Sequence, residues 1–137
     1  MRAVLDVNVI ISAILSPAGR PAEVLRRWLE GSVELVVSPM LLDELARALA
    51  YKKLAARVTD DERNELVLLL RRAATLVDDP GTPSPVRSAD PDDDYVIALA
   101  AAQGALIVSG DRHLTDLADE IPVFTPAQLL DHLDRER

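Results

Sequence analysis

Short apolar runs alternate with longer segments of helical character along this chain, and this alternation constrains the fold more than any other feature. The runs are residues 2–6, 33–37, 75–77, 105–108 and 123–124. Strands that alternate with helices favour a parallel sheet, since each parallel connection needs a crossover segment. The sequence therefore predicts an α/β fold with a parallel sheet.

Several residues mark where the intervening helices begin and end. Ser38 is a good N-cap with Pro39 at the first helical position, and Thr59 and Glu62 fit a capping box. Gly104 suits a left-handed helix stop. We expect helices at residues 22–30, 39–51, 60–74, 91–104 and 114–119, a helix or turn at residues 9–15, and a last helix from Pro126 to the C-terminus.

Composition limits the chemistry that this chain can carry. Its 137 residues, 49% of them hydrophobic, fit a single domain spanning residues 1–137 with a substantial core. There is no cysteine, which excludes disulfides and thiolate metal sites, and the two histidines are too few for a zinc cage. Any metal site would use hard oxygen ligands, which points to Mg²⁺ or Mn²⁺.

Charge and hydropathy bear on location and partners. The N-terminus lacks the pattern of a signal peptide and no apolar stretch is long enough for a membrane span, so we expect a cytoplasmic protein without membrane attachment. The net charge of −8 argues against bulk electrostatic binding of nucleic acid. A basic group in the first half could line an RNA path, although a solvated surface with ion pairs is the better interpretation for most of its members: Arg20, Arg26, Arg27, Arg47, Lys52, Lys53 and Arg57.

Four acidic residues fall where a parallel sheet would bring distant segments together. Asp6 ends the first apolar run, Asp111 follows the fourth, and Glu44 and Asp93 lie near the starts of two predicted helices. Open α/β folds bind ligands at the carboxyl ends of their strands. Carboxylates gathered there repel one another, and a divalent cation is the usual remedy. Each acid alone could be a cap or surface residue, but together they predict a metal-dependent enzyme.

Three segments of the chain match one family pattern in order and spacing. They are Val4-Leu5-Asp6-Val7-Asn8-Val9, Ser38-Pro39 with Glu44 behind it, and Asp90-Pro91-Asp92-Asp93-Asp94 leading through Gly104 to Val108-Ser109-Gly110-Asp111. In this combination the chain resembles PIN-domain proteins over essentially its whole length. It most resembles the small prokaryotic members that are the toxin components of toxin–antitoxin pairs, relatives of VapC.

The resemblance implies a five-stranded parallel sheet flanked by helices, an α/β/α sandwich, and Mg²⁺- or Mn²⁺-dependent cleavage of RNA phosphodiester bonds. Carried over to this sequence, the catalytic and metal-binding acids would be Asp6, Glu44, Asp93 and Asp111. Asn8 would support Asp6 or a water on the metal.

Two further residues take part in this assignment. Ser109 would be a polar group behind the acids, and Asp94 is the alternative to Asp93 as the third acid, because residues 92–94 are three consecutive aspartates. The spacing to Gly104 and Asp111 favours Asp93.

The resemblance also implies partners: an RNA substrate, a protein antitoxin that inserts a helix into the acidic pocket, and a second copy of the chain in a homodimer. Two other functions stay open. One is a catalytically silent PIN-fold binding or regulatory module, which a metal titration would separate from the nuclease. The other is an aspartyl-phosphate phosphatase, which is weak because Asn8 stands where the second aspartate of that class would serve as the acid.

Overall fold

Five short strands pair in parallel in the order β3-β2-β1-β4-β5, as the sequence predicted. The computed structural model describes residues 1–51, 54 and 56–136. Ala3 in the central strand lies opposite Leu35 on one side and Leu106 on the other. The strands are β1 (Arg2–Leu5), β2 (Glu34–Val37), β3 (Thr75–Leu76), β4 (Leu106–Val108) and β5 (Val123–Phe124).

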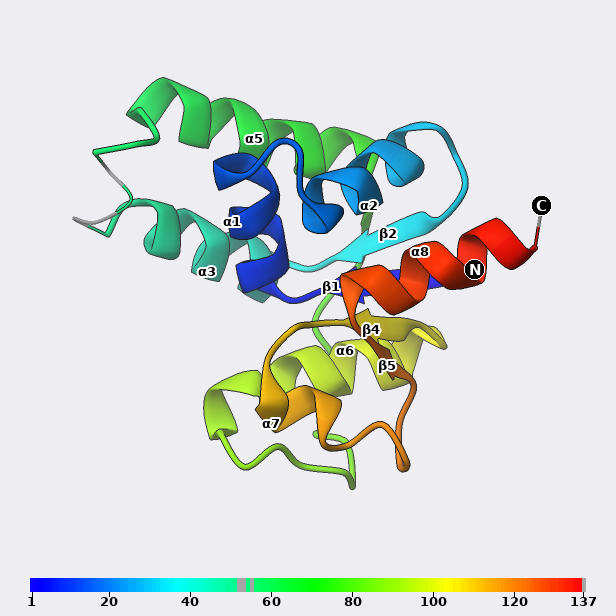
Figure 1. Ribbon diagram of the computed structural model, residues 1–137. Coiled ribbons are helices and arrows are strands. Elements are labelled where there is room, and N and C mark those ends of the chain that lie inside the picture. Colours follow the sequence, from blue (N-terminus) through cyan, green and yellow to red (C-terminus); the bar gives the residue numbers. More distant parts are fainter. Residues whose placement is uncertain (52–53, 55, 137) are drawn as a thin grey trace.

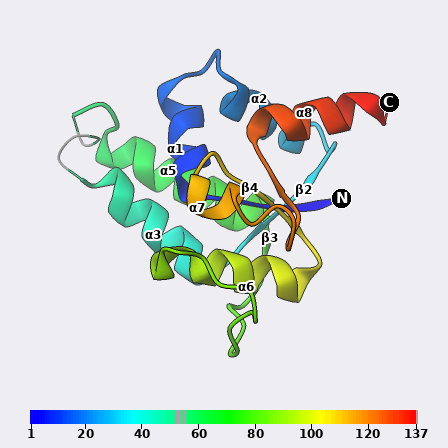
Figure 2. The same cartoon turned by 60° about the horizontal axis from the view of Figure 1, so that its bottom comes forward.

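Helices cover both faces of the sheet, which confirms the expected α/β/α arrangement. Helices α1, α2 and α5 lie on one face and α6 on the opposite face (Figure 1; Figure 2 gives the rotated view). The helices are α1 (Val7–Leu15), α2 (Arg20–Leu29), α3 (Pro39–Leu49), α5 (Asp60–Ala73), the 3₁₀ turn η1 (Pro91–Asp93), α6 (Asp94–Gln103), α7 (Arg112–Thr115) and α8 (Pro126–Arg135).

The sheet is buried between these layers, so its strands are apolar on both faces. Residues 3–5 of β1 and 35–37 of β2 are almost completely inaccessible to solvent, and Leu45, Leu70 and Leu99 from three helices pack into the same core. A parallel sheet covered on both sides requires such continuous apolar runs. Within the described residues, no helix has the length and apolar character needed to cross a membrane.

The cap residues identified in the sequence lie at the helix termini where they were predicted. The hydroxyl of Ser38 accepts a hydrogen bond from the backbone N–H of Leu41, and Thr59 and Glu62 form the complete capping box at the start of α5. Gly104 adopts the left-handed conformation, with φ of 59°, after α6. These signals are local, which is why the sequence was enough to find them.

Two predicted helices differ from the structure. The helix expected at residues 114–119 is instead α7, and it begins earlier because the Asp111 side chain caps it by accepting from the N–H of His113. The helix expected from Pro91 begins as the 3₁₀ turn η1 before the α-helix proper, and Asp93 is the N-cap of α6. Both corrections concern the segments that carry candidate site acids.

Candidate metal centre

The candidate site lies where the strand order reverses. Strands β2 and β3 extend the sheet on one side of β1, and β4 and β5 extend it on the other. The first acid, Asp6, follows β1 directly, and Asp111 follows β4 three residues after its end. A parallel sheet opens a crevice at the carboxyl ends of the two strands that flank such a reversal.

Asp6 is fixed by the chain on both sides of it. Its backbone N–H donates to the carbonyl of Val108 in β4 (3.0 Å), and its own carbonyl accepts from the N–H of Val9 (2.9 Å). The side chain is 6% exposed, and Oδ1 caps α1 by accepting from the N–H of Asn8 (3.3 Å). A carboxylate is therefore held, nearly buried, at the end of the central strand.

Ser109 connects Asp6 to Asp111. This serine is completely buried, its hydroxyl donates to Oδ2 of Asp6 (2.9 Å), and its oxygen accepts from the N–H of Asp111 (3.0 Å). The role expected for Ser109, a polar group behind the acids, agrees with these two contacts.

Glu44 reaches the same region from α3. Its charge acts on Asp6 and also on Tyr95 of α6, whose phenol has a raised pKa because it is buried and lies beside the Glu44 carboxylate. Tyr95 also feels the charges of Asp6 and Asp93, so it lies among three of the four acids. Tyr95 could not be predicted as part of the site, because a tyrosine in the first turn of a helix carries no local sign of such a position.

Asp93 contributes from the turn before α6. Its Oδ2 atom is buried and has no hydrogen-bond partner among the described residues. Burial, followed by the charges of Asp6, Asp111 and Asp90, raises the pKa of Asp93 from the ordinary value of 3.8 to about 6. A buried carboxylate oxygen without a partner, among other carboxylates, lowers the stability of the fold unless a cation binds to it.

Asp94, the alternative third acid, has different partners. Its Oδ1 accepts from the N–H of Ser88 (2.8 Å), and its Oδ2 lies 3.5 Å from a guanidinium nitrogen of Arg87. It is not among the charges that act on Asp6 or Asp93. These contacts favour Asp93 over Asp94 as the third acid. Asp94 instead holds the preceding loop through its contacts with Ser88 and Arg87.

The electrostatics of Asp6 show that these acids come together. Burial raises the pKa of Asp6, the hydrogen bonds from Ser109 and Asn8 oppose this, and the charges of Asp111 and Glu44 add to the increase. In the part of the chain that the structure describes, none of the four site acids makes an ion pair with a lysine or arginine. The imidazole of His113 lies 3.5 Å from Oδ1 of Asp111 and opposes the rise in the pKa of Asp93, but burial and the other carboxylates outweigh it.

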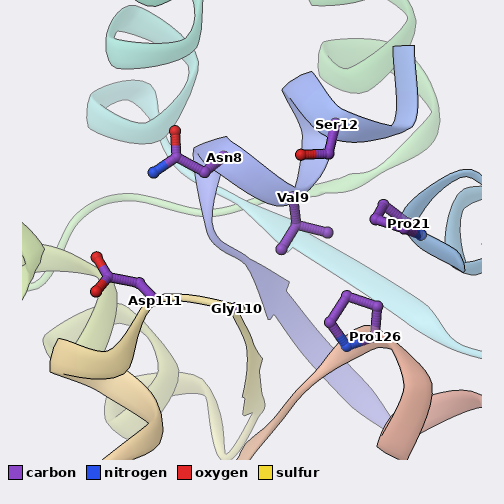
Figure 3. Close-up of a pocket in the computed structure, with 7 residues that line it drawn as sticks. All are labelled: Asn8, Val9, Ser12, Pro21, Gly110, Asp111 and Pro126. Atoms are coloured by element: carbon purple, nitrogen blue, oxygen red, sulfur yellow. The ribbon is translucent and has the colours of Figure 1, made fainter. Parts of the chain in front are cut away.

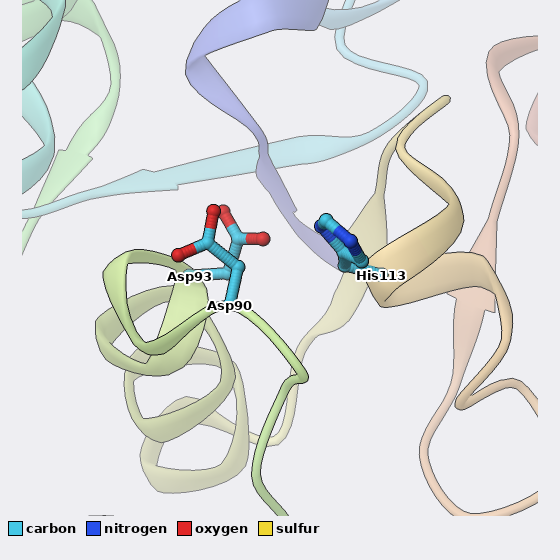
Figure 4. A group of neighbouring side chains, drawn as sticks. All are labelled: Asp90, Asp93 and His113. Carbon is cyan, nitrogen blue, oxygen red and sulfur yellow. The ribbon is translucent and has the colours of Figure 1, made fainter.

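Two residues besides the four acids, Asp90 and His113, lie at the edge of this centre. Carboxylate oxygens of Asp90 and Asp93 and a ring nitrogen of His113 all lie within 4.8 Å of one another. Figure 4 shows the two carboxylates on one side and the imidazole facing them from α7. Asp90 also caps the turn that follows it, because its Oδ1 accepts from the N–H of Asp92 (3.1 Å).

Two cavities flank the acids. One, of about 400 Å³, is lined by Asn8, Ser12 and Asp111 with Val9, Pro21, Gly110 and Pro126 around them (Figure 3). The other, of about 540 Å³, is lined by Glu44 and Tyr95 together with Met40, Arg47, Ala48, Tyr51, Pro91 and Asp92. Asn8 supports Asp6 through its backbone N–H, and its exposed side chain borders the first cavity.

The basic group proposed as an RNA path is only partly compatible with the structure. Arg27 is buried and pairs with Asp134 of α8 and with Glu23, so it is unavailable to RNA. Arg26 also pairs with Glu23. Arg47, by contrast, lines the cavity beside Glu44. Lys52 and Lys53 lie outside the described residues.

The donor set fits a hard divalent cation. Asp6, Glu44, Asp93 and Asp111 offer oxygen ligands, Oδ2 of Asp93 has no hydrogen-bond partner among the described residues, and the pKa values of Asp6 and Asp93 are raised by burial and then by neighbouring negative charge. Oxygen-rich anionic sites of this kind suit Mg²⁺ and Mn²⁺.

Comparison with known proteins agrees with the architecture. The uncharacterized protein MJ1680 of Methanocaldococcus jannaschii is 27% identical over 98% of this chain and 93% of its own length. VapBC2 of Rickettsia felis, solved bound to a DNA fragment from its promoter, matches 91% of this chain and 98% of its own with a TM-score of 0.60 and 16% identity. FitAcB of Neisseria gonorrhoeae matches the same shares with a TM-score of 0.58 and 21% identity. At these identities the two structures establish a shared fold.

The family model described as "PIN domain" matches residues 2–113, most of the chain, and this segment contains all four site acids. The chain therefore belongs to the PIN domain family.

Proposed function

We propose that this protein is a metal-dependent endoribonuclease, cytoplasmic, that acts as the toxin of a type II toxin–antitoxin pair. The observation that carries the proposal is the convergence of Asp6, Glu44, Asp93 and Asp111 without an ion pair to a lysine or arginine among the described residues. Membership of the PIN domain family supports nuclease chemistry at this position.

A divalent ion bound by these acids would lower the pKa of the attacking water and offset charge on the phosphodiester. Other residues of the chain hold the metal-binding carboxylates in place. Ser109 fixes the orientation of Asp6 by its hydrogen bond to Oδ2, and it holds the backbone of Asp111. The helix cap formed by Asp6 with the N–H of Asn8 fixes the second oxygen.

The two cavities on either side of the acids offer room for the RNA chain. The cavity beside Glu44 contains Arg47, which can contact a phosphate, and Tyr51, whose side chain is largely exposed and can stack on a base. A net charge of −8 means that bound cations and a few such local groups must make the approach of RNA favourable.

A protein antitoxin and a second copy of the chain are the proposed partners. The structural matches to VapBC2 and FitAcB support this part of the proposal through the shared fold. A cationic side chain supplied by the antitoxin would relieve the repulsion among the acids in the way that a metal ion would.

Cleavage of RNA by the purified protein tests the function. The protein should cut RNA with Mg²⁺ or Mn²⁺, stop on addition of EDTA, and lose activity in Asp6→Asn and Asp93→Asn. Asp43→Asn, exposed beside Glu44 on α3, is the matched control and should stay active. Absence of cleavage across several RNAs and metal concentrations would favour a catalytically silent binding module instead.

A further inference from the structure

Asp90, Asp93 and His113 form a mixed ligand set next to the four acids. Their candidate donor atoms lie within 4.8 Å of one another although they come from two separate segments, the turn before α6 and the start of α7. Figure 4 shows the imidazole directed toward the two carboxylates. Donor atoms this close can share one ion.

The side chain of Ser88 links the two segments. The hydroxyl of Ser88 lies 3.4 Å from the carbonyl oxygen of His113, to which it donates, and it accepts from the N–H of Asp90 (3.1 Å). Asp90 uses Oδ1 to cap the turn, which leaves its other oxygen for a ligand. These hydrogen bonds therefore hold the two segments that carry the three candidate ligands next to each other.

This set differs chemically from a group of acids. The orphaned Oδ2 of Asp93 is buried and lacks a partner among the described residues, and the imidazole adds a nitrogen donor. Nδ1 of His113 lies 3.5 Å from Oδ1 of Asp111, and a histidine that faces a carboxylate through one ring nitrogen commonly binds metal through the other. Nitrogen ligands are accepted by zinc and other first-row transition metals, whereas Mg²⁺ prefers oxygen.

We propose that Asp90, Asp93 and His113 form a cation position that takes a first-row transition-metal ion such as Zn²⁺ and discriminates against Mg²⁺. The position rests on the proposed function only through Asp93, which it shares with the four-acid centre. It would make this protein sensitive to the kind of divalent ion available as well as to its concentration.

The chain has only two histidines, which gives a direct test. Imidazole NMR signals of tag-free protein should be followed while one equivalent of Zn²⁺ is added, and again with excess Mg²⁺. The His113 signals, assigned by their loss in His113→Ala, should shift with Zn²⁺ and stay unchanged with Mg²⁺. The His132 ring, on α8, is the internal control and should not respond to one equivalent of Zn²⁺.

A matched pair of variants tests the carboxylate ligand. Asp90→Asn keeps an oxygen to cap the turn but removes a charge. It should weaken Zn²⁺ binding at least about tenfold, because even the loss of a residue that only hydrogen-bonds a metal ligand lowers the affinity by about that factor. Asp92→Asn, two residues away and exposed, should leave binding unchanged.

The proposal is overturned if Zn²⁺ leaves the His113 signals in place, if Mg²⁺ shifts them equally, or if Asp90→Asn and Asp92→Asn bind Zn²⁺ alike. The readout needs no RNA. A zinc response without RNA cleavage would support the zinc position and contradict the proposed nuclease function. RNA cleavage without a zinc response would support the nuclease function and contradict the zinc position.

Discussion

Ser109 is the residue through which two of the site acids are held in one arrangement. Its hydroxyl donates to Asp6 and accepts from the backbone of Asp111, and all of this happens in a position without solvent access. The hydrogen bond to Asp6 lowers the pKa of that carboxyl and so opposes the effect of burial. The hydroxyl of Ser109 thus favours the ionised form of Asp6.

Ser109→Ala should therefore weaken both the fold and the metal centre. The change leaves a buried carboxylate oxygen and a backbone N–H without partners, which costs about 1–3 kcal/mol in the free energy of unfolding. Metal affinity should also fall, because Asp6 becomes harder to ionise. Urea denaturation and metal titration measure the two effects, with the exposed Ser32→Ala as control. Equal stability of the two variants would show that the bridge does not contribute.

Asp93→Asn should stabilise the metal-free protein near neutral pH. The pKa of Asp93 is about 6 in the folded state and 3.8 as its ordinary value, so the folded state holds the extra proton between these values. Stability from this group consequently falls as pH rises from about 4 to about 6, and the full cost is present above that window. Removing the charge should raise the free energy of unfolding at pH 7.5 by roughly 1 kcal/mol, a figure reduced for solvent screening.

Unfolding in EDTA at pH 4.5 and pH 7.5 checks the sign. The gain from Asp93→Asn should be larger at pH 7.5, and Asp92→Asn should give little gain at either pH because that side chain is exposed. A stabilisation by Asp93→Asn that does not change with pH would contradict the raised pKa. The same titration predicts that metal binding weakens as pH falls through about 6.

At the scale of single elements, α6 sets the position of the third acid. Its N-cap is Asp93, and its C-terminus ends at Gly104 with φ of 59° before the chain enters β4. A Cβ at Gly104 would meet nothing within 4 Å, so conformation alone requires glycine there. The turn decides how α6 returns to the sheet.

Gly104→Ala should lower the free energy of unfolding by about 1 kcal/mol, because residues with a Cβ adopt the left-handed conformation at a cost of that order. Asparagine tolerates this conformation better, so Gly104→Asn should cost less than alanine. Gly81→Ala, in a loop where φ is not positive, is the control. Thermal unfolding of the three variants would test this order, and equal stability of Gly104→Ala and Gly81→Ala would contradict it.

Local signals of this kind explain which elements were predictable. Ser38, Thr59 and Gly104 each act within four residues, and the helix ends that they mark were predicted correctly. The start of α7 was wrong because the cap that Asp111 forms was not used to place the first residue of that helix. The side chain of Asp111 is both a candidate site acid and a helix cap.

At the scale of the whole molecule, the alternation of strands and helices determined the parallel sheet and placed the acids at one edge of it. Pairings between distant segments could not be predicted in the same way. Arg27 and Asp134 are 107 positions apart, and their contact fastens α2 to α8. The approach of His113 to Asp90 and the place of Tyr95 among the acids likewise depend on tertiary packing. Such contacts have no signature in the sequence near either partner.

The central claim is that four carboxylates from different parts of the chain act together as one divalent-ion site. Calorimetric titration with Mn²⁺ of the wild type, Asp6→Asn, Glu44→Gln, Asp93→Asn and Asp111→Asn measures this directly, with Asp43→Asn and Asp92→Asn as exposed controls on the same two segments. We expect affinity to fall in each of the four site variants and to stay at the wild-type value in both controls. Wild-type affinity in Asp6→Asn, the most buried of the four, would contradict the account.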